Sequence, residues 1–179
     1  RTYIADGSRF ENDAEHAWHI AVMALLLAEY SNSAIDKLKV VSILLIHDLV
    51  EIYAGDTFAY DTEGLKTQKA REAEAAERLF SQLPEDLAFS MGRLWEEFES
   101  GNTPEAKFAH TLDNFQPLML QAETDGRVWA ECGRKLSEVL KRNENTAAGS
   151  NQLWNYAYHN FITPQINSGH LADDLKTEP

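Results

Sequence analysis

The chain has 179 residues, of which 44% are hydrophobic, so it is long enough to bury one substantial core. Its formal net charge of −13 disfavours binding to nucleic-acid polymers, because such binding requires clustered basic side chains. No apolar run approaches the roughly 20 residues needed to cross a bilayer, so we expect no membrane insertion. The single cysteine, Cys132, excludes an intrachain disulfide and is typical of a reducing compartment, so we expect a cytoplasmic protein.

The first half of the chain shows apolar residues at helical spacing, and no sustained period-two alternation occurs anywhere, which predicts an all-α fold. Asn12 or Asp13 is expected to cap a first helix that runs to about Glu29. Asp36 is expected to begin a second helix, strongly apolar, that ends at Gly55.

The middle of the chain predicts three more helices. A long and largely exposed helix is expected over residues 63–83, and Pro84 separates it from a fourth. Thr103, followed by a proline, is expected to begin a fifth helix that runs to about Glu123. Because Pro117 lies within this fifth helix, we expect a kink or an early end there.

The last third of the chain predicts two helices over residues 127–142 and 152–166, with a polar loop at 143–151 between them. We therefore expect a single compact helical domain of about six to seven helices over residues 1–167. Residues 168–179 read as a polar C-terminal tail that frays.

Polar residues interrupt three of the apolar helices. His47-Asp48 lies in the second helix, His16 at the start of the first, and Asp113 in the fifth. Burial of such groups is unfavourable unless a cation, an ion pair or a dense set of hydrogen bonds compensates it. A His-Asp dipeptide alone is more often an ordinary hydrogen-bonded pair. Three such positions favour one shared centre, in which two imidazoles and two carboxylates balance a divalent cation.

The segments ENDAEHAW (11–18), HDLVEIYAGD (47–56) and TPEAKF (103–108) resemble the HD-domain metal-dependent phosphohydrolases, whose signature is H…HD…D. They are most similar to the branch that contains bacterial 5′-deoxynucleotidases and their eukaryotic relatives. The resemblance covers most of the chain from Arg1 to about Leu120. It implies that one divalent ion is bound by the four residues that the polar positions also select: His16, His47, Asp48 and Asp113.

Further side chains acquire roles beside this ligand set. Glu51 lies one turn beyond the His-Asp pair, and the resemblance implies that it handles protons at the reacting phosphate. Asp56 follows a helix-terminating glycine and is expected to orient or deprotonate the attacking water. Arg9 is expected to bind the phosphoryl group through forked hydrogen bonds. Arg1 matches, by its spacing to His16, an arginine of the family's substrate pocket.

The function expected from these residues is metal-dependent hydrolysis of (deoxy)nucleoside 5′-monophosphates to nucleoside and phosphate. The ligand set would accept Mn, Co, Fe, Ni, Zn or Mg. The resemblance also implies a homodimer, for which the aromatic helices after Arg127 could supply an interface. The sequence departs from the family at Thr2, where bacterial deoxynucleotidases carry an aromatic residue that excludes a ribose 2′-hydroxyl, so selectivity for deoxyribose is left open.

Two alternatives remain. One is an HD hydrolase of nucleoside triphosphates or guanosine polyphosphate alarmones, which the few basic residues near the motifs disfavour. The other is a non-catalytic helical interaction protein that the ion only stabilises. His19 and His110 each lie one turn from an expected ligand and could bind a second ion. The segment before the His-Asp pair, however, lacks the extra His and Glu residues of the two-metal branches.

Overall fold

The computed structural model describes residues 2–57 and 60–176. Within these ranges every named element is a helix, and the β pairing consists of two isolated bridges, Tyr3 with Phe10 and Lys135 with Ala172. The predicted all-α fold is confirmed. In the same ranges, no helix combines the length and the apolar character that crossing a bilayer requires.

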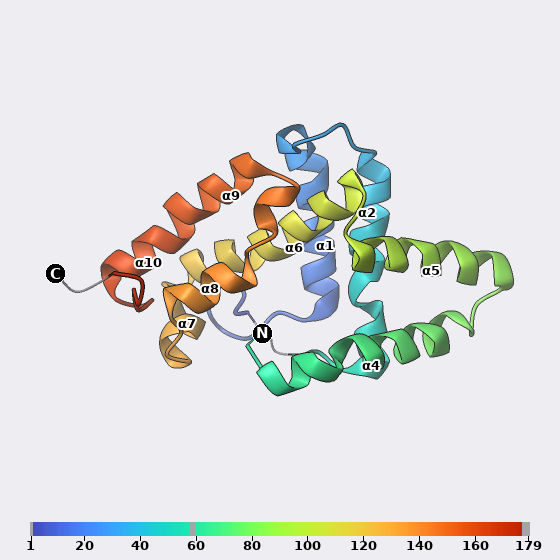
Figure 1. The fold of residues 1–179 in the computed structure, drawn as a ribbon, viewed down its shortest axis with the longest axis horizontal. Helices are drawn as coiled ribbons and strands as arrows, with labels where there is room; N and C mark the ends of the chain where they lie inside the picture. Colours follow the sequence, from blue (N-terminus) through green and yellow to red (C-terminus); the bar gives the residue numbers. More distant parts are fainter. Residues whose placement is uncertain (1, 58–59, 177–179) are drawn as a thin grey trace.

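Three helices occupy the centre of the molecule (Figure 1): α1 (Asp13–Leu27), α2 (Lys37–Ile46) and α6 (Pro104–Glu123). Their facing sides bury apolar residues that form most of the main core, and this burial is the principal stabilising contribution to the fold. The fully buried members on these helices include Ile20, Val40, Ile43, Leu44, Phe108 and Leu112.

The starts of these helices follow the predicted caps. The side chains of Asn12, Asp36 and Thr103 each accept a hydrogen bond from a backbone amide of the first turn. Helix α6 ends at Glu123, as predicted, so the early end that Pro117 could have caused does not occur. A proline inside a helix removes one backbone hydrogen bond, and the dense burial on both sides of this position holds the helix together in spite of that loss.

Two helices, α4 (Thr62–Phe80) and α5 (Glu85–Ser100), form a hairpin that extends away from the central helices (Figure 1). A second and smaller apolar cluster lies between them and the short α3 (Glu51–Ala54). Its buried members are Ile46, Val50, Ala75, Ala76 and Phe80.

The C-terminal third divides into shorter helices than the sequence predicts. The helix expected over residues 127–142 breaks at Gly133, whose φ of +59° lies in the left-handed region that glycine favours. The segment from residue 151 stays helical but contains a π-helical stretch just before Pro164, whose ring nitrogen has no proton to donate. The bounds are α7 (Arg127–Glu131), α8 (Leu136–Arg142), α9 (Asn151–Ala157), the π-helical Tyr158–Ile162 and α10 (Thr163–Ser168), with short 3₁₀ helices at Ala28–Tyr30 and Thr146–Ala148.

The segment after residue 167, which we expected to fray, packs against the domain as far as residue 174. Leu171 is only 1% exposed and belongs to the main core. Its backbone amide donates to the carbonyl of Gln165, and Asp174 accepts hydrogen bonds from the backbone and the hydroxyl of Ser137. One apolar side chain, buried by tertiary contacts, therefore fixes a stretch whose composition alone predicts a free tail.

Candidate metal centre and the cavity beside it

The sequence predicted that the His-Asp pair lies on a continuous α-helix, but the structure shows a change of helix type there. Helix α2 ends at Ile46, and a 3₁₀ helix, His47–Val50, follows it. Within this 3₁₀ turn the Nε2 atom of His47 lies 3.0 Å from Oδ1 of Asp48. Side chains three residues apart eclipse in a 3₁₀ turn, so Glu51 lies over Asp48 rather than over His47.

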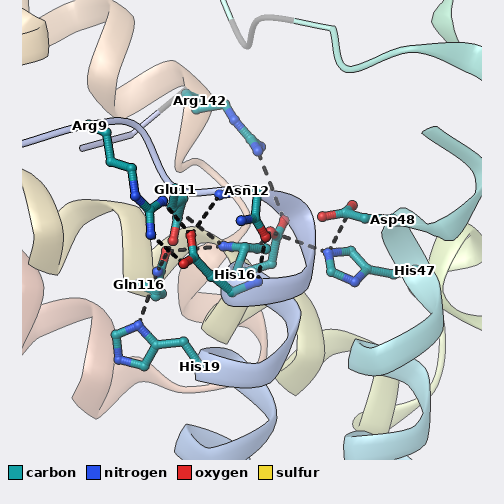
Figure 2. Close-up of polar contacts among 11 residues, drawn as sticks. Arg9, Glu11, Asn12, His16, His19, His47, Asp48, Gln116 and Arg142 are labelled. Carbon is teal, nitrogen blue, oxygen red and sulfur yellow. Dashed lines mark hydrogen bonds and ion pairs between the residues drawn. The ribbon is translucent and has the colours of Figure 1, made fainter. Parts of the chain in front are cut away.

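His16 is oriented by a network that the sequence did not reveal. Its Nδ1–H donates to Oε1 of Gln116 at 3.1 Å, which leaves Nε2 directed at Asp113. The amide nitrogen of Gln116 donates in turn to Glu11 and to Nδ1 of His19. Figure 2 follows this network from Glu11 and His19 through Gln116 to His16. The only sequence signal for Gln116 is its position three residues after Asp113, on the same face of α6.

Asp113 joins the two histidines. Its Oδ1 lies 3.1 Å from Nε2 of His16 and 3.6 Å from Nε2 of His47. Donor atoms of His16, His47 and Asp48 lie within 4.8 Å of one another. The four side chains expected to bind one metal ion therefore meet at one place, although they come from α1, the turn after α2 and α6.

The donor chemistry of this cluster fits a divalent cation. His47 is 4% exposed and places its Nδ1 2.8 Å from the carbonyl of Leu44, which fixes the proton on that nitrogen. Its buried Nε2 lies 3.0 Å from Oδ1 of Asp48 but does not have the geometry of a hydrogen bond in the described structure. A buried nitrogen without a hydrogen bond is unfavourable. A cation between this nitrogen and the neighbouring carboxylates would satisfy it.

The electrostatics of the metal-free chain lead to the same conclusion. Burial acts to lower the pKa of His16, but its hydrogen bonds with Asp113 and Glu11 outweigh burial and raise the pKa to about 11. Burial acts to raise the pKa of Asp113, but the hydrogen bond from His16 holds it well below the usual value. The site therefore attracts positive charge, and a metal ion would have to displace a proton from it.

A cavity of about 930 Å³ adjoins the cluster and contains both expected catalytic carboxylates, Glu51 and Asp56, in its lining. Burial is the main cause that raises the pKa of Glu51 to about 8, and the charges of Asp48 and Asp56 add to it. Glu51 is thus protonated at neutral pH in the metal-free chain. Asp56 follows Gly55, whose φ of +76° ends α3 and turns the chain along the cavity wall.

Arg9, one of the two arginines expected at the phosphate, does not lie in this cavity. Arg9 forms a paired contact with Glu15, at 2.7 and 2.5 Å, on the surface, and does not line the cavity. Glu15 is also the capping-box residue of α1, so the contact ties the N-terminal segment to that helix. Arg1 lies outside the described residues.

Three other cations line the cavity, Lys69 from α4 and Lys141 and Arg142 from the end of α8. The guanidinium of Arg142 lies 4.0 Å from Oδ2 of Asp113 (Figure 2). Sequence reasoning missed all three, because each occupies an ordinary polar position of an amphipathic helix and nothing in its neighbourhood along the chain marks it.

Neither His19 nor His110 is placed to bind a second ion. His19 accepts the hydrogen bond from Gln116, and His110 places its Nε2 2.8 Å from the carbonyl of Phe98. Among the described residues, the metal-binding geometry is confined to the cluster around His16, His47 and Asp48.

Comparison with known proteins identifies the family of the chain. A family model of the HD domain matches residues 1–154. The crystal structure of a protein described as a predicted metal-dependent phosphohydrolase, from Magnetospirillum magnetotacticum MS-1, superposes with a TM-score of 0.89 at 45% identity, over 96% of this chain and 85% of that one.

Curated relatives include 5′-deoxynucleotidase HDDC2 from Homo sapiens, 32% identical over 64% of this chain and 55% of that protein. The Bos taurus protein of the same name is 34% identical over 63% of this chain and 54% of its own length. The match thus spans about half the length of these relatives.

Proposed function

Because the chain belongs to the HD domain family, we propose that it is a metal-dependent phosphohydrolase that converts (deoxy)nucleoside 5′-monophosphates to nucleoside and phosphate. The observation that carries this proposal is the convergence of His16, His47, Asp48 and Asp113 beside a large cavity whose wall includes Glu51. The names of the curated relatives support the substrate class.

We assign one divalent ion to these four side chains, of Mn, Co, Fe, Ni, Zn or Mg. Such an ion supplies Lewis acidity at the phosphoryl group and makes water a better nucleophile near neutral pH. The chain's contribution is to fix the donors. The backbone carbonyl of Leu44 orients His47, and Gln116 orients His16, so that each imidazole presents its Nε2.

The remaining steps belong to side chains of the cavity wall. Glu51, which holds a proton at neutral pH, donates it to the leaving oxygen of the nucleoside. Asp56 accepts a hydrogen bond from the attacking water and orients it. Arg142 takes the phosphate-binding role that we expected of Arg9, because its guanidinium lies beside Asp113 and offers several donors to phosphate oxygens.

An activity panel tests the proposal. Purified protein, with each metal added in turn, is incubated with ribo- and deoxyribonucleoside monophosphates, and released phosphate is measured with and without EDTA. We expect metal-dependent release that EDTA abolishes. Thr2 lines the cavity, so comparing ribose with deoxyribose substrates decides whether this small residue admits the 2′-hydroxyl. No release from any monophosphate would overturn the proposal.

The same panel separates the two alternatives. Release of pyrophosphate or triphosphate from nucleoside triphosphates or guanosine polyphosphates would favour a hydrolase of those compounds. Metal binding without hydrolysis of any substrate, together with a Glu51→Ala variant that changes only stability, would favour a structural role for the ion.

We propose in addition that the protein is a homodimer in the cytoplasm, where the unpaired Cys132 would stay reduced. The helices after residue 127 are poor candidates for the interface, because Trp129 is buried in the main core. Helices α1 and α2, with the turn and α3 that follow, expose more apolar surface instead. The exposed residues there include Trp18, Leu26, Leu38, Leu45 and Ile52.

Light scattering tests the dimer. We expect a dimer mass for the unaltered chain and a monomer mass for Leu38→Glu. Phe89→Glu, a change of the same kind on α5, is the control and should leave the mass unchanged, because Phe89 is equally exposed but lies away from this face. A monomer mass for the unaltered chain would contradict the proposal.

A further inference from the structure

Helix α6 carries two uncharged carboxamides that the proposed reaction does not use. Asn114 is 8% exposed and Gln121 is 5% exposed, and both line the large cavity. Neither side chain makes a hydrogen bond in the described structure, and the Oε1 atom of Gln121 is fully buried without a partner. Buried amide oxygens are ordinarily paired, so the unpaired Oε1 of Gln121 beside this cavity points to a ligand that pairs the amide.

The two carboxamides share one face of α6, which adjoins the face of the expected metal ligand Asp113. Residues 114 and 121 are seven apart, which is close to two helical turns, and Leu118 lies between them on that face. From Asp113 to Gln121 the helix rises by about 12 Å at 1.5 Å per residue. This span is comparable to the length of an extended nucleoside monophosphate whose phosphate lies at the metal centre.

The surroundings of Gln121 suit a flat and largely apolar group. The backbone amide of Gly126 donates to the carbonyl of Gln121 at 2.7 Å, which brings the start of α7 beside this residue. From α7, Val128 and Trp129 line the same cavity. The cations that line the cavity lie on α4 and α8, and neither α6 nor α7 contributes one.

We propose that the base of the nucleotide lies at this end of the cavity and that the Gln121 carboxamide hydrogen-bonds to its edge. A carboxamide offers an acceptor and a donor side by side, and the edge of a nucleobase presents the complementary pair. The inference rests on the proposed function, which places the phosphate at the metal centre. It adds that Gln121 selects nucleotides over phosphomonoesters that have no base.

The test compares substrates that differ only in the base. The kcat/KM of phosphate release is measured for the deoxynucleoside monophosphates and for deoxyribose 5-phosphate, and the ratio of the two is the readout. Gln121→Met keeps the size of the side chain and removes its polar atoms. We expect this variant to lower the ratio about tenfold. Gln152→Met, at an exposed position of α9, is the matched control and should leave the ratio unchanged.

Thermal unfolding distinguishes this role from a structural one. Because Gln121→Met removes an unpaired buried acceptor, we expect its Tm to be no lower than that of the unaltered protein. A large fall in Tm would show that the amide serves the fold, and would overturn the inference. So would a ratio that stays the same in a variant that is stably folded.

Binding of nucleosides without phosphate keeps the two proposals separable. Calorimetry on the metal-loaded protein should show binding of a deoxynucleoside, weakened about tenfold by Gln121→Met. If the unaltered protein hydrolyses the nucleotides but Gln121→Met changes neither selectivity nor nucleoside binding, only the inference fails. If no substrate is hydrolysed, the proposed function fails, and the nucleoside titration still decides the role of Gln121.

Discussion

The two walls of the cavity are built differently. One wall carries the four expected metal ligands on α1 and α6, which pack into the main core, and on the turn after α2, whose Val50 belongs to the smaller cluster. The other carries Glu51 and Asp56 on α3 and the loop after it, which rest on the smaller cluster with α4. The first wall holds the expected ligands in position, whereas on the second wall burial and neighbouring charges raise the pKa of Glu51. The comparison suggests that metal binding and proton transfer can be disabled separately.

The largest effect is expected from Asp113→Asn on the wall of metal ligands. The substitution removes one negative charge between His16 and His47. Loss of a residue that only hydrogen-bonds to a metal ligand lowers metal affinity by about 10–100-fold, so loss of this charge should lower it further. Phosphate release should become undetectable with it. Calorimetric metal titration and the phosphate assay measure both. Asp86→Asn, at an exposed position on α5, is the control, and retained metal binding in Asp113→Asn would show that the ion is held elsewhere.

Glu51→Gln on the opposite wall should lower kcat by about 100-fold or more while metal affinity stays close to that of the unaltered protein. The reason is that the amide cannot donate the proton that Glu51 holds at neutral pH, and Glu51 is not among the expected ligands. Phosphate release and metal titration of the same sample give the two numbers. Glu77→Gln, on the exposed side of α4, should change neither. If Glu51→Gln lost activity and metal binding equally, the two walls would not act separately, and this prediction would be wrong.

Gln116→Leu tests whether orientation of a ligand matters as much as its presence. The change removes the acceptor of the His16 Nδ1 proton, so we expect metal affinity to fall about 10–100-fold. Added metal in excess should restore most of the activity. Gln152→Leu provides a surface control. If saturating metal leaves the activity of Gln116→Leu low, the glutamine has a role beyond positioning His16.

The smallest effect concerns stability of the metal-free protein. The pKa of Glu51 is raised from 4.5 to about 8 in the fold, so the unfolded chain loses this proton at lower pH than the folded chain. The contribution of Glu51 is therefore present below pH 4.5 and is lost as the pH rises toward 8. Because glutamine does not titrate, the Glu51→Gln variant does not lose this stability as the pH rises. Urea unfolding should show Glu51→Gln gaining stability relative to the unaltered protein between pH 5 and pH 8.5, and a constant difference would contradict the assigned pKa.

Much of the proposed ligand set could be predicted from the sequence because each of its members disturbs a local pattern. His16, His47 and Asp113 are polar positions in apolar helices, and the caps at Asn12 and Thr103 mark where two of those helices begin. Such signals depend on neighbours within one or two turns, so they are visible along the chain.

The side chain that orients His16 and the basic side chains of the cavity leave no such mark. Gln116 acquires its role only because His16 lies beside it from a position 100 residues away. Arg142 meets Asp113 across the cavity, and Arg9, which the sequence favoured, is held by Glu15 at the surface. A basic residue looks the same in a sequence whether it faces solvent or a substrate.

The sequence by itself determined the helical class, the starts of the main helices and the four residues that meet, because helical periodicity, capping and the unfavourable burial of charge are local physical constraints. The tertiary structure decided the 3₁₀ turn at His47, the burial of Leu171, the raised pKa of Glu51 and the unpaired amide of Gln121. Each of these depends on how much solvent the folded chain excludes and on which charges it brings near, and both are properties of packing between distant segments.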